Sequence, residues 1–232
     1  MIAHPEMQKR AQDELDAVVG RSRTPSFGDA PNLPYIQALV KESLRWRPPL
    51  PLGVPHTTTQ DDWYEGMFIP KGTMCFVNLY HCHHDPAAYG PDAANFNPER
   101  FLDEHGRLIP GPVETHDDGH STYGFGRRSC IGKHAANDTS FIDIATVLWA
   151  AHLEPALDEN RKEIPVDTDT SIDLGTVLYV TSPFRVFLFS SSWMSNSNWV
   201  DFSRPLPYKC RITPRFPEAS ALLMDEIELL KA

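Results

Sequence analysis

The chain has 232 residues and carries 21 Lys and Arg against 31 Asp and Glu, a formal net charge of −10. This acidic balance leaves no basic surface for a phosphate backbone, so nucleic acid is not an expected partner. No run of about 18 apolar residues could span a bilayer, and the N-terminus is polar rather than leader-like. Proline is enriched, at 21 residues against a usual share of about 5%, which predicts long ordered loops.

Helical periodicity marks three segments. An amphipathic helix is predicted over residues 1–20 and ends at Gly20. A linker rich in Pro, Ser and Gly follows, and a second helix begins near Pro34 and is stopped by Pro48-Pro49. The strongest helical pattern covers about residues 133–152. The buried side of that helix is expected to comprise Ala135, Phe141, Ile142, Ala145, Leu148 and Trp149.

Between the second and third helices the pattern changes to short strands and loops. Residues 50–78 alternate β-branched or aromatic stretches with polar turns, which predicts a small antiparallel sheet. Residues 81–112 contain several proline-bearing turns and are expected to be mainly loop, with one short helix near Ala87. The expected fold class is therefore mainly α with small antiparallel β-sheets (α+β).

The loop Tyr123-Gly-Phe-Gly-Arg-Arg-Ser-Cys-Ile-Gly132 carries the main chemical signal. It places Cys130 just before a long helix, where the helix dipole and free backbone N–H groups favour the thiolate. Gly126 and Gly132 allow the backbone to approach a flat ligand closely, and Arg128 offers a guanidinium that matches a carboxylate. These parts indicate haem, because a thiolate axial ligand favours O–O cleavage.

This loop resembles the haem-binding signature FxxGxRxCxG of the cytochrome P450 monooxygenases, with Tyr123 in place of the usual Phe. Three further blocks resemble the same family in the same order. They are Glu42-Ser-Leu-Arg45, Phe96-Asn-Pro-Glu-Arg-Phe101 and, at residues 207–215, PYKCRITPR. The resemblance implies the C-terminal, proximal half of that fold, of fungal type.

The resemblance implies a cofactor site. Cys130 is the expected axial ligand of the iron in haem b, and Arg128 and His56 are the expected partners of the haem propionates. The rest of the predicted cofactor-binding set is Tyr123, Gly126 and Gly132.

The resemblance also implies a structural network of Glu42, Arg45 and Arg100 that braces the cysteine loop. Periodicity alone gives a different interpretation. Glu42 and Arg45 lie off the apolar stripe of their helix. This position predicts an exposed i,i+3 ion pair that stabilises the helix by about 0.2–0.5 kcal/mol.

The activity that the resemblance implies is insertion of one oxygen atom of O2 into a small organic substrate, with electrons from an NADPH-dependent reductase. Arg127, Arg128, Lys133 and His134 are either scattered solvent charges or contacts for an acidic electron donor. Full-length relatives are usually anchored at the endoplasmic reticulum. The helix that delivers protons to bound oxygen in this family lies outside the resemblance, so the alternative is a catalytically incompetent fragment that retains the haem-ligand loop. The substrate is left unassigned.

Residues 179–202 interrupt the family's pattern. They are rich in Ser, Phe and Trp without a clear amphipathic period. We hypothesise a translated intron, because the codons around Leu178 and Phe202 can spell splice sites. The chain is then divided into residues 1–178, the insertion 179–202, and residues 203–232 with the C-terminal hairpin and tail.

Three short motifs in the sequence are typical of other kinds of site. His81-Cys82-His83-His84 offers zinc-type ligands, although adjacent residues do not easily converge on one tetrahedral ion. Gly124-Phe-Gly126 imitates a dinucleotide fingerprint without its third glycine. Asn137-Asp-Thr139 is a glycosylation sequon on a predicted helix. The four cysteines lack CxxC spacing, so a disulfide framework is not expected.

Overall fold

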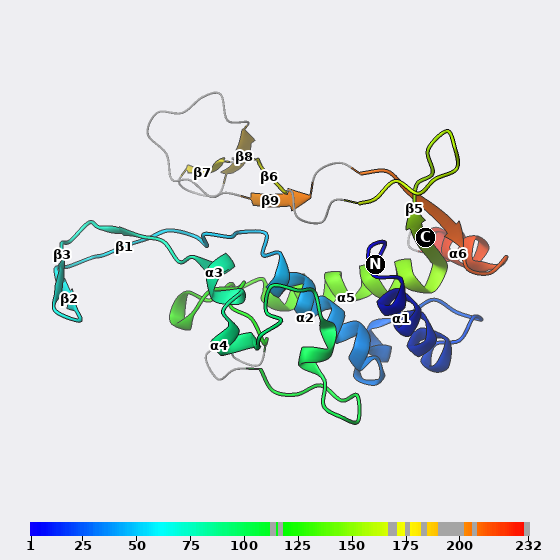
Figure 1. Ribbon diagram of the computed structural model, residues 1–232. Helices are drawn as coiled ribbons and strands as arrows, with labels where there is room; N and C mark the ends of the chain where they lie inside the picture. Colours follow the sequence, from blue (N-terminus) through cyan, green and yellow to red (C-terminus); the bar gives the residue numbers. More distant parts are fainter. Residues whose placement is uncertain are drawn as a thin grey trace.

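The computed structural model describes residues 1–111, 115, 118–166, 171–174, 177–181, 185–189, 202–205 and 208–229. Its centre is formed by α1 (Pro5–Val18), α2 (Pro34–Trp46) and α5 (Lys133–Ala150). Short helices and strand pairs extend from this centre (Figure 1). This architecture confirms the expected class, mainly α with small antiparallel strand pairs.

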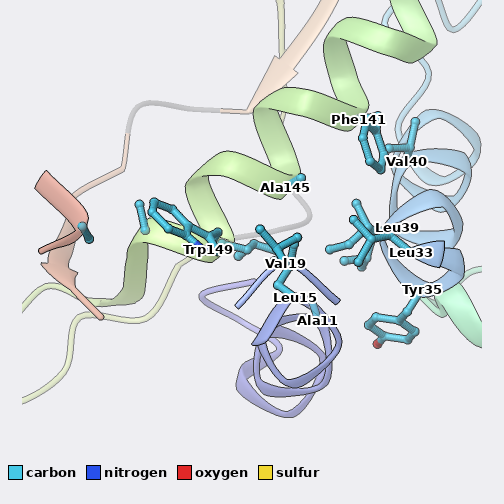
Figure 2. Close-up of a cluster of buried hydrophobic side chains, with 14 of the residues drawn as sticks. Ala11, Leu15, Val19, Leu33, Tyr35, Leu39, Val40, Phe141, Ala145 and Trp149 are labelled. Carbon is cyan, nitrogen blue, oxygen red and sulfur yellow. The ribbon is translucent and has the colours of Figure 1, made fainter. Parts of the chain in front are cut away.

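The hydrophobic core lies where α1, α2 and α5 meet (Figure 2). Trp149 is fully buried there, and its indole N–H donates to the Gly20 carbonyl at 2.7 Å. Phe216 from the C-terminal part packs edge-on against Trp149, with ring centroids 4.9 Å apart. Burial of each large apolar side chain contributes about 1.5–3 kcal/mol. The cluster comprises Ala11, Leu15, Val19, Leu33, Tyr35, Ile36, Leu39, Val40, Phe141, Ala145, Leu148, Trp149, Ala150, Phe216 and Ala219.

The predicted buried side of the third helix is partly wrong. Ala135 is exposed and Ile142 is only half-buried. The reason is that the first two turns of α5 extend beyond the core cluster, whose first α5 member is Phe141. The helix also ends at Ala150, two residues earlier than expected, because the chain continues as a strand from Ala151.

The start of α2 is satisfied by a neighbouring helix. Pro34 occupies its first turn, and the residue before it, Leu33, provides no side-chain cap. The carboxylate of Glu14 on α1 accepts hydrogen bonds from the backbone N–H groups of Tyr35, at 2.9 Å, and Ile36, at 3.1 Å. Two of the donors that a helix start leaves unpaired are thereby bonded.

An arm of short strands follows α2 (Figure 1). The predicted small sheet consists of two separate antiparallel pairs, β1 with β4 and β2 with β3. Glu65 and Gly66, which join β2 to β3, both have positive φ angles, of 49° and 80°. This is the backbone that a tight two-residue hairpin turn requires. The strands are β1 (His56–Thr57), β2 (Asp62–Tyr64), β3 (Met67–Ile69) and β4 (Met74–Cys75).

The proline-rich stretch after the arm contains more helix than expected. The predicted helix near Ala87 is α4 (Pro86–Tyr89), but α3 (Leu79–His83) was not predicted. It is only five residues long, too short for periodicity, and begins where the Asn78 side chain accepts from the His81 N–H at 3.0 Å. The 3-10 helices whose bounds the structure gives are η1 (Phe27–Asn32), before α2, and η2 (Pro98–Phe101) and η4 (Gly126–Arg128), after α4.

The C-terminal part returns to the core. Strand β10 pairs antiparallel with β5, which directly continues α5, and an unpredicted helix, α6, follows β10. Two more antiparallel pairs are β6 with β9 and β7 with β8. The bounds are β5 (Ala151–Pro155), β6 (Ser171–Leu174), β7 (Val177–Thr181), β8 (Arg185–Phe189), β9 (Phe202–Pro205), β10 (Cys210–Pro214) and α6 (Ala219–Leu229).

The predicted insertion lies largely outside the described residues; within 179–202 the structure gives the end of β7, all of β8 and the start of β9. The proposed boundaries at 178 and 203 stay a prediction. Among the helices that the structure does describe, none combines the length and the hydropathy needed to cross a bilayer.

Candidate functional site

The cysteine loop is closed by a backbone hydrogen bond of the cysteine itself. The N–H of Cys130 donates to the Tyr123 carbonyl at 2.8 Å. Inside the loop, Gly124 and Gly126 have positive φ angles of 76° and 54°, a conformation that a side chain disfavours. The helix α5 begins three residues after Cys130, at Lys133. The sequence thus places the thiol at the N-terminal end of the longest helix described.

The thiol of Cys130 is exposed, and so are its apolar neighbours. Cys130 is a free cysteine, while Ile131 is fully exposed and Phe125 is 41% exposed. A Cβ added to Gly126 would meet no atom within 4 Å, so the space beside the loop is open. A soft thiolate flanked by exposed apolar side chains suits iron in a flat apolar ring system. These residues fit a haem.

Tyr123 fastens the loop to the helix behind it. Its hydroxyl donates to Oδ1 of Asn137, on the second turn of α5, at 2.6 Å. Burial raises the pKa of Tyr123 to about 12, with the nearby Asp118 and Cys130 acting in the same direction. The phenol is therefore a neutral donor across the physiological range.

Glu42 and Arg45 form a fully buried ion pair on α2, each with 0% exposed side-chain surface. Nε of Arg45 donates to Glu42 Oε2 at 2.6 Å and its Nη2 donates to Oε1 at 2.8 Å, a bidentate arrangement. The remaining donors of the guanidinium bond the backbone carbonyls of His83, Ala93 and Asn95. The periodicity interpretation, an exposed surface pair, is thus wrong. The long loop before η2 covers this side of α2 and accepts these bonds.

Arg100 joins this pair from η2, as the resemblance implied. Its Nε lies 3.3 Å from the Glu42 carboxylate, and its Nη2 donates to Asp92 Oδ2 at 3.1 Å. The backbone N–H of Asn97 also donates to Glu42 Oε1, at 2.6 Å. The structure therefore brings Glu42, Arg45 and Arg100 into one network and adds Asp92, which the sequence interpretation did not include.

Two predicted cofactor residues are not in contact with the network. Arg128 is exposed in η4, and His56 is exposed in β1, opposite Cys75 of β4. Among the described residues, the structure shows no hydrogen bond or ion pair between His56 and the cysteine loop. A role of Arg128 and His56 toward haem propionates stays a prediction.

The four adjacent zinc-type residues do not face one point. His83 is fully buried, His81 and Cys82 are exposed, and His84 turns back to contact the Tyr80 carbonyl at 2.7 Å. Within the part of the chain that the structure describes, no three His, Cys, Asp or Glu side chains gather as a metal site.

The residues that sequence reasoning missed are those that connect distant segments. They are Asp92, Asn137 and His83, the last of which bonds the segment that enters the cysteine loop. No sequence signal marks these contacts, because each depends on a loop whose path periodicity does not encode. Only Asn97 carried a visible sign, since an Asn before a Pro is a frequent cap, and its side chain does accept from the Glu99 N–H.

The structure combines an exposed cysteine in a glycine loop, ahead of a helix, with a buried Glu-Arg-Arg network, which is the arrangement expected of the haem-thiolate class. Comparison with known proteins agrees with this class. The model of the cytochrome P450 family matches residues 1–175. The chain belongs to the cytochrome P450 family.

The relatives found are fungal monooxygenases. A cytochrome P450 monooxygenase of Armillaria gallica is 51% identical over 230 residues, which cover 99% of this chain and 39% of the relative. A cytochrome P450 monooxygenase of Amanita muscaria is 38% identical over 275 residues, which cover 99% of this chain and 44% of the relative. One from Postia placenta is 44% identical over 224 residues, covering 96% and 37%. The chain spans about two fifths of the length of these curated relatives. Membership of this family implies a haem cofactor.

Proposed function

We propose that this chain forms the thiolate side of a haem-dependent monooxygenase that inserts one O2-derived oxygen atom into a small organic substrate. The observation that carries the proposal is the exposed thiol of Cys130, held by a closed loop whose entering segment is bonded to α2 through the Thr122 hydroxyl and the Leu44 carbonyl. A haem bound there supplies the oxygen chemistry, because thiolate ligation donates electron density that favours O–O cleavage. Family membership and fungal relatives support this assignment.

The chain's own residues would hold and orient haem b. Cys130 would ligate the iron, the side chains of Phe125 and Ile131 would pack on apolar ring surface, and Arg128 and His56 would neutralise the propionates. Gly126 carries no Cβ, which permits its positive φ angle and would let the backbone approach the ring. Glu42, Arg45 and Arg100 fix the loop around η2 and thereby the scaffold on which the cysteine loop rests.

Electrons are proposed to come from an NADPH-dependent reductase that docks near the cysteine loop. Arg127, Arg128 and His134 are exposed there and can attract an acidic surface. Lys133 is less available, because its Nζ lies 3.2 Å from Asp118 in a largely buried ion pair.

Haem titration tests the proposal. The chain is mixed with haem, reduced, exposed to CO and compared with Cys130→Ser. We expect stoichiometric uptake and the long-wavelength Soret band of a thiolate-ligated haem in the unsubstituted chain, and loss of that band in Cys130→Ser. An identical spectrum in both proteins would remove Cys130 from the role of ligand.

The second candidate is a catalytically incompetent chain that keeps the haem-ligand loop. The exposure of Cys130 and Ile131 favours it, because a haem bound at exposed side chains buries little apolar surface and is held weakly. The same titration decides. No haem uptake by a folded chain supports this candidate, and uptake with substrate oxidation in the presence of a reductase excludes it.

A further inference from the structure

We propose that His83 is a positioning residue that connects the Glu42–Arg45–Arg100 network to the cysteine loop and so fixes the position of Cys130. The proposal rests on the proposed function of Cys130 as haem ligand. It assigns a role to a side chain that the sequence marks only as one of four adjacent zinc-type residues and that lies outside the haem-ligand motif.

His83 is bonded on both of its sides. It is the last residue of α3 and has 0% exposed surface. Its backbone carbonyl accepts a hydrogen bond from Nη1 of Arg45. Its ring Nε2 accepts a hydrogen bond from the backbone N–H of Ser121 at 2.9 Å. One residue thus bridges the buried guanidinium and the chain segment that enters the cysteine loop.

The ring state suits an acceptor. Burial lowers the pKa of His83 to about 4, and the charge of Arg45 also disfavours the imidazolium. The neutral ring has one protonated nitrogen, and because Nε2 accepts, the proton lies on Nδ1. Nδ1 is buried without a hydrogen-bond partner among the residues that the structure describes. Among the described residues, the hydrogen bond from Ser121 is therefore the one that the ring makes, beside its packing against Tyr89 and His120.

The contact with Ser121 reaches the cysteine through the loop backbone. The Ser121 carbonyl accepts from the Gly124 N–H at 2.9 Å, and the Tyr123 carbonyl accepts from the Cys130 N–H at 2.8 Å. The hydroxyl of Thr122 adds a second attachment, to the Leu44 carbonyl on α2 at 2.8 Å. A shift of Ser121 therefore moves the acceptor that holds Cys130.

Three substitutions separate the acceptor role from simple packing. His83→Gln can place its amide oxygen where Nε2 lies. His83→Asn is shorter and reaches only the position of Nδ1, and His83→Leu has no acceptor. His84→Leu is the matched control, because the neighbouring ring bonds the Tyr80 carbonyl and stacks on the Tyr80 ring, one turn back in its own helix.

The first readout is amide hydrogen exchange in the chain without haem, followed in peptides that contain Ser121 and Cys130. We expect exchange in this loop to be about tenfold faster in His83→Asn and His83→Leu, and near the unsubstituted rate in His83→Gln and His84→Leu. Unchanged exchange in His83→Asn and His83→Leu overturns the proposal. Equal acceleration in His83→Gln and His83→Asn overturns it too, because it makes the ring a packing element.

The second readout is the spectrum and midpoint potential of the haem-loaded variants. We expect His83→Leu to bind haem but convert part of the thiolate Soret band to the short-wavelength form, with rescue by His83→Gln. Absence of the thiolate band in the unsubstituted chain refutes the proposed function, whereas the exchange experiment still decides the connection through His83. Normal thiolate bands and potentials in all variants refute the positioning of Cys130.

Discussion

Arg45 illustrates how a charged side chain can be buried completely. A guanidinium has five N–H donors, and here two of them meet Glu42 while the others meet three backbone carbonyls. A buried ion pair of this kind adds little stability over an apolar pair, because the attraction between the charges is offset by the free-energy cost of removing both from water. Removing one partner alone is much more costly, because the other charge stays buried and uncompensated.

Glu42→Gln is accordingly expected to lower the free energy of unfolding by about 3–5 kcal/mol. The amide keeps the shape of the side chain but leaves Arg45 without its counter-charge. Urea denaturation followed by circular dichroism measures the change. The control is Lys9→Ala, which breaks an exposed i,i+4 pair with Asp13 and should cost no more than about 0.5 kcal/mol. Equal effects of the two substitutions would contradict the buried-pair argument.

Two buried histidines should make the chain sensitive to mild acid. Burial lowers the pKa of His83 to about 4 and that of His120 to about 3, where His83 and nearby cations also contribute. The unfolded chain, with ordinary histidine pKa values of about 6.5, binds protons that the folded chain does not. The free energy of unfolding is therefore unaffected by these two groups above about pH 6.5 and falls as the pH drops toward 4. Because two protons are involved, it falls by at most about 2.7 kcal/mol per pH unit.

Urea titrations at several pH values between 7.5 and 4.5 test this slope. His120→Gln cannot titrate and is expected to remove about half of it. His105→Gln is the control, because the side chain of His105 is exposed. A slope that is the same in His120→Gln and the unsubstituted chain would show that folding does not lower the pKa of His120.

At this scale the sequence predicted residue types better than their surroundings. The cysteine, the loop glycines and the Glu42–Arg45 block were visible as a motif, because motifs preserve local spacing. The burial of Arg45 was not visible, because its covering carbonyls belong to residues about fifty positions further along the chain. Helical periodicity reports only the apolar stripe and assigns every other position to solvent.

At the scale of elements, α2 depends on its neighbour for its start. Leu33 precedes Pro34 and has no capping side chain, so Glu14 on α1 supplies the acceptor from outside the helix. The sequence indicated where α2 begins through the proline at its first turn. It did not indicate the cap, because capping rules consider only residues adjacent in the chain.

Glu14→Ala is expected to destabilise the protein by about 1 kcal/mol, the usual cost of losing an N-cap. Glu14→Gln retains one acceptor oxygen and should cost less. Chemical denaturation measures both, and amide exchange of Tyr35 and Ile36 shows whether the loss is local to the start of α2. Asp13→Ala, one position away and exposed, is the control. Unchanged exchange at Tyr35 and Ile36 in Glu14→Ala would contradict the cap.

Element types followed from periodicity where segments were long. The helices near residues 5–18, 34–46 and 133–150 and the small antiparallel pairs were expected, whereas α3 and α6 were not. The short α3 depends on a single Asn cap and on burial of its last residue, His83. A five-residue helix is too short to leave a periodic pattern that can be counted.

At the scale of the whole molecule, the C-terminal part is tied to the first helix. Arg215, with 5% exposed side-chain surface, donates to Asp16 on α1 at 2.9 Å and to the Trp149 carbonyl at 3.1 Å. The side chains of Gln8 and Gln12 on α1 bond backbone carbonyls of β5, each at 3.0 Å. These contacts hold β5 and β10 to the core independently of the segment between β7 and β9.

The segment 179–202 can therefore be removed with little loss of the core. Its flanks, β6 and β9, already pair antiparallel, with Ser171 opposite Pro205 and Leu174 opposite Phe202. The two strands form four register pairs in all. Joining Leu178 to Ser203 keeps three of them, because only the pair of Leu174 with Phe202 is lost. Residues 174–178 then form the connecting loop. Five residues are within the usual length for a hairpin loop. The match to the family model, which ends at residue 175, also precedes the segment.

Deletion of residues 179–202 is thus expected to leave the urea midpoint and haem uptake close to those of the full chain and to reduce light scattering at high concentration. The physical reason for the last effect is the removal of a stretch with four Phe and two Trp, a composition that promotes self-association when it is not packed. Deletion of residues 179–205 is the matched control, because it also removes β9 and leaves β6 without its partner. Unfolding of the shorter deletion would show that the segment is an integral part of the domain. The presence of codons 179–202 in every mature transcript would refute the intron hypothesis, whereas transcripts that join the codons of Leu178 and Ser203 would support it.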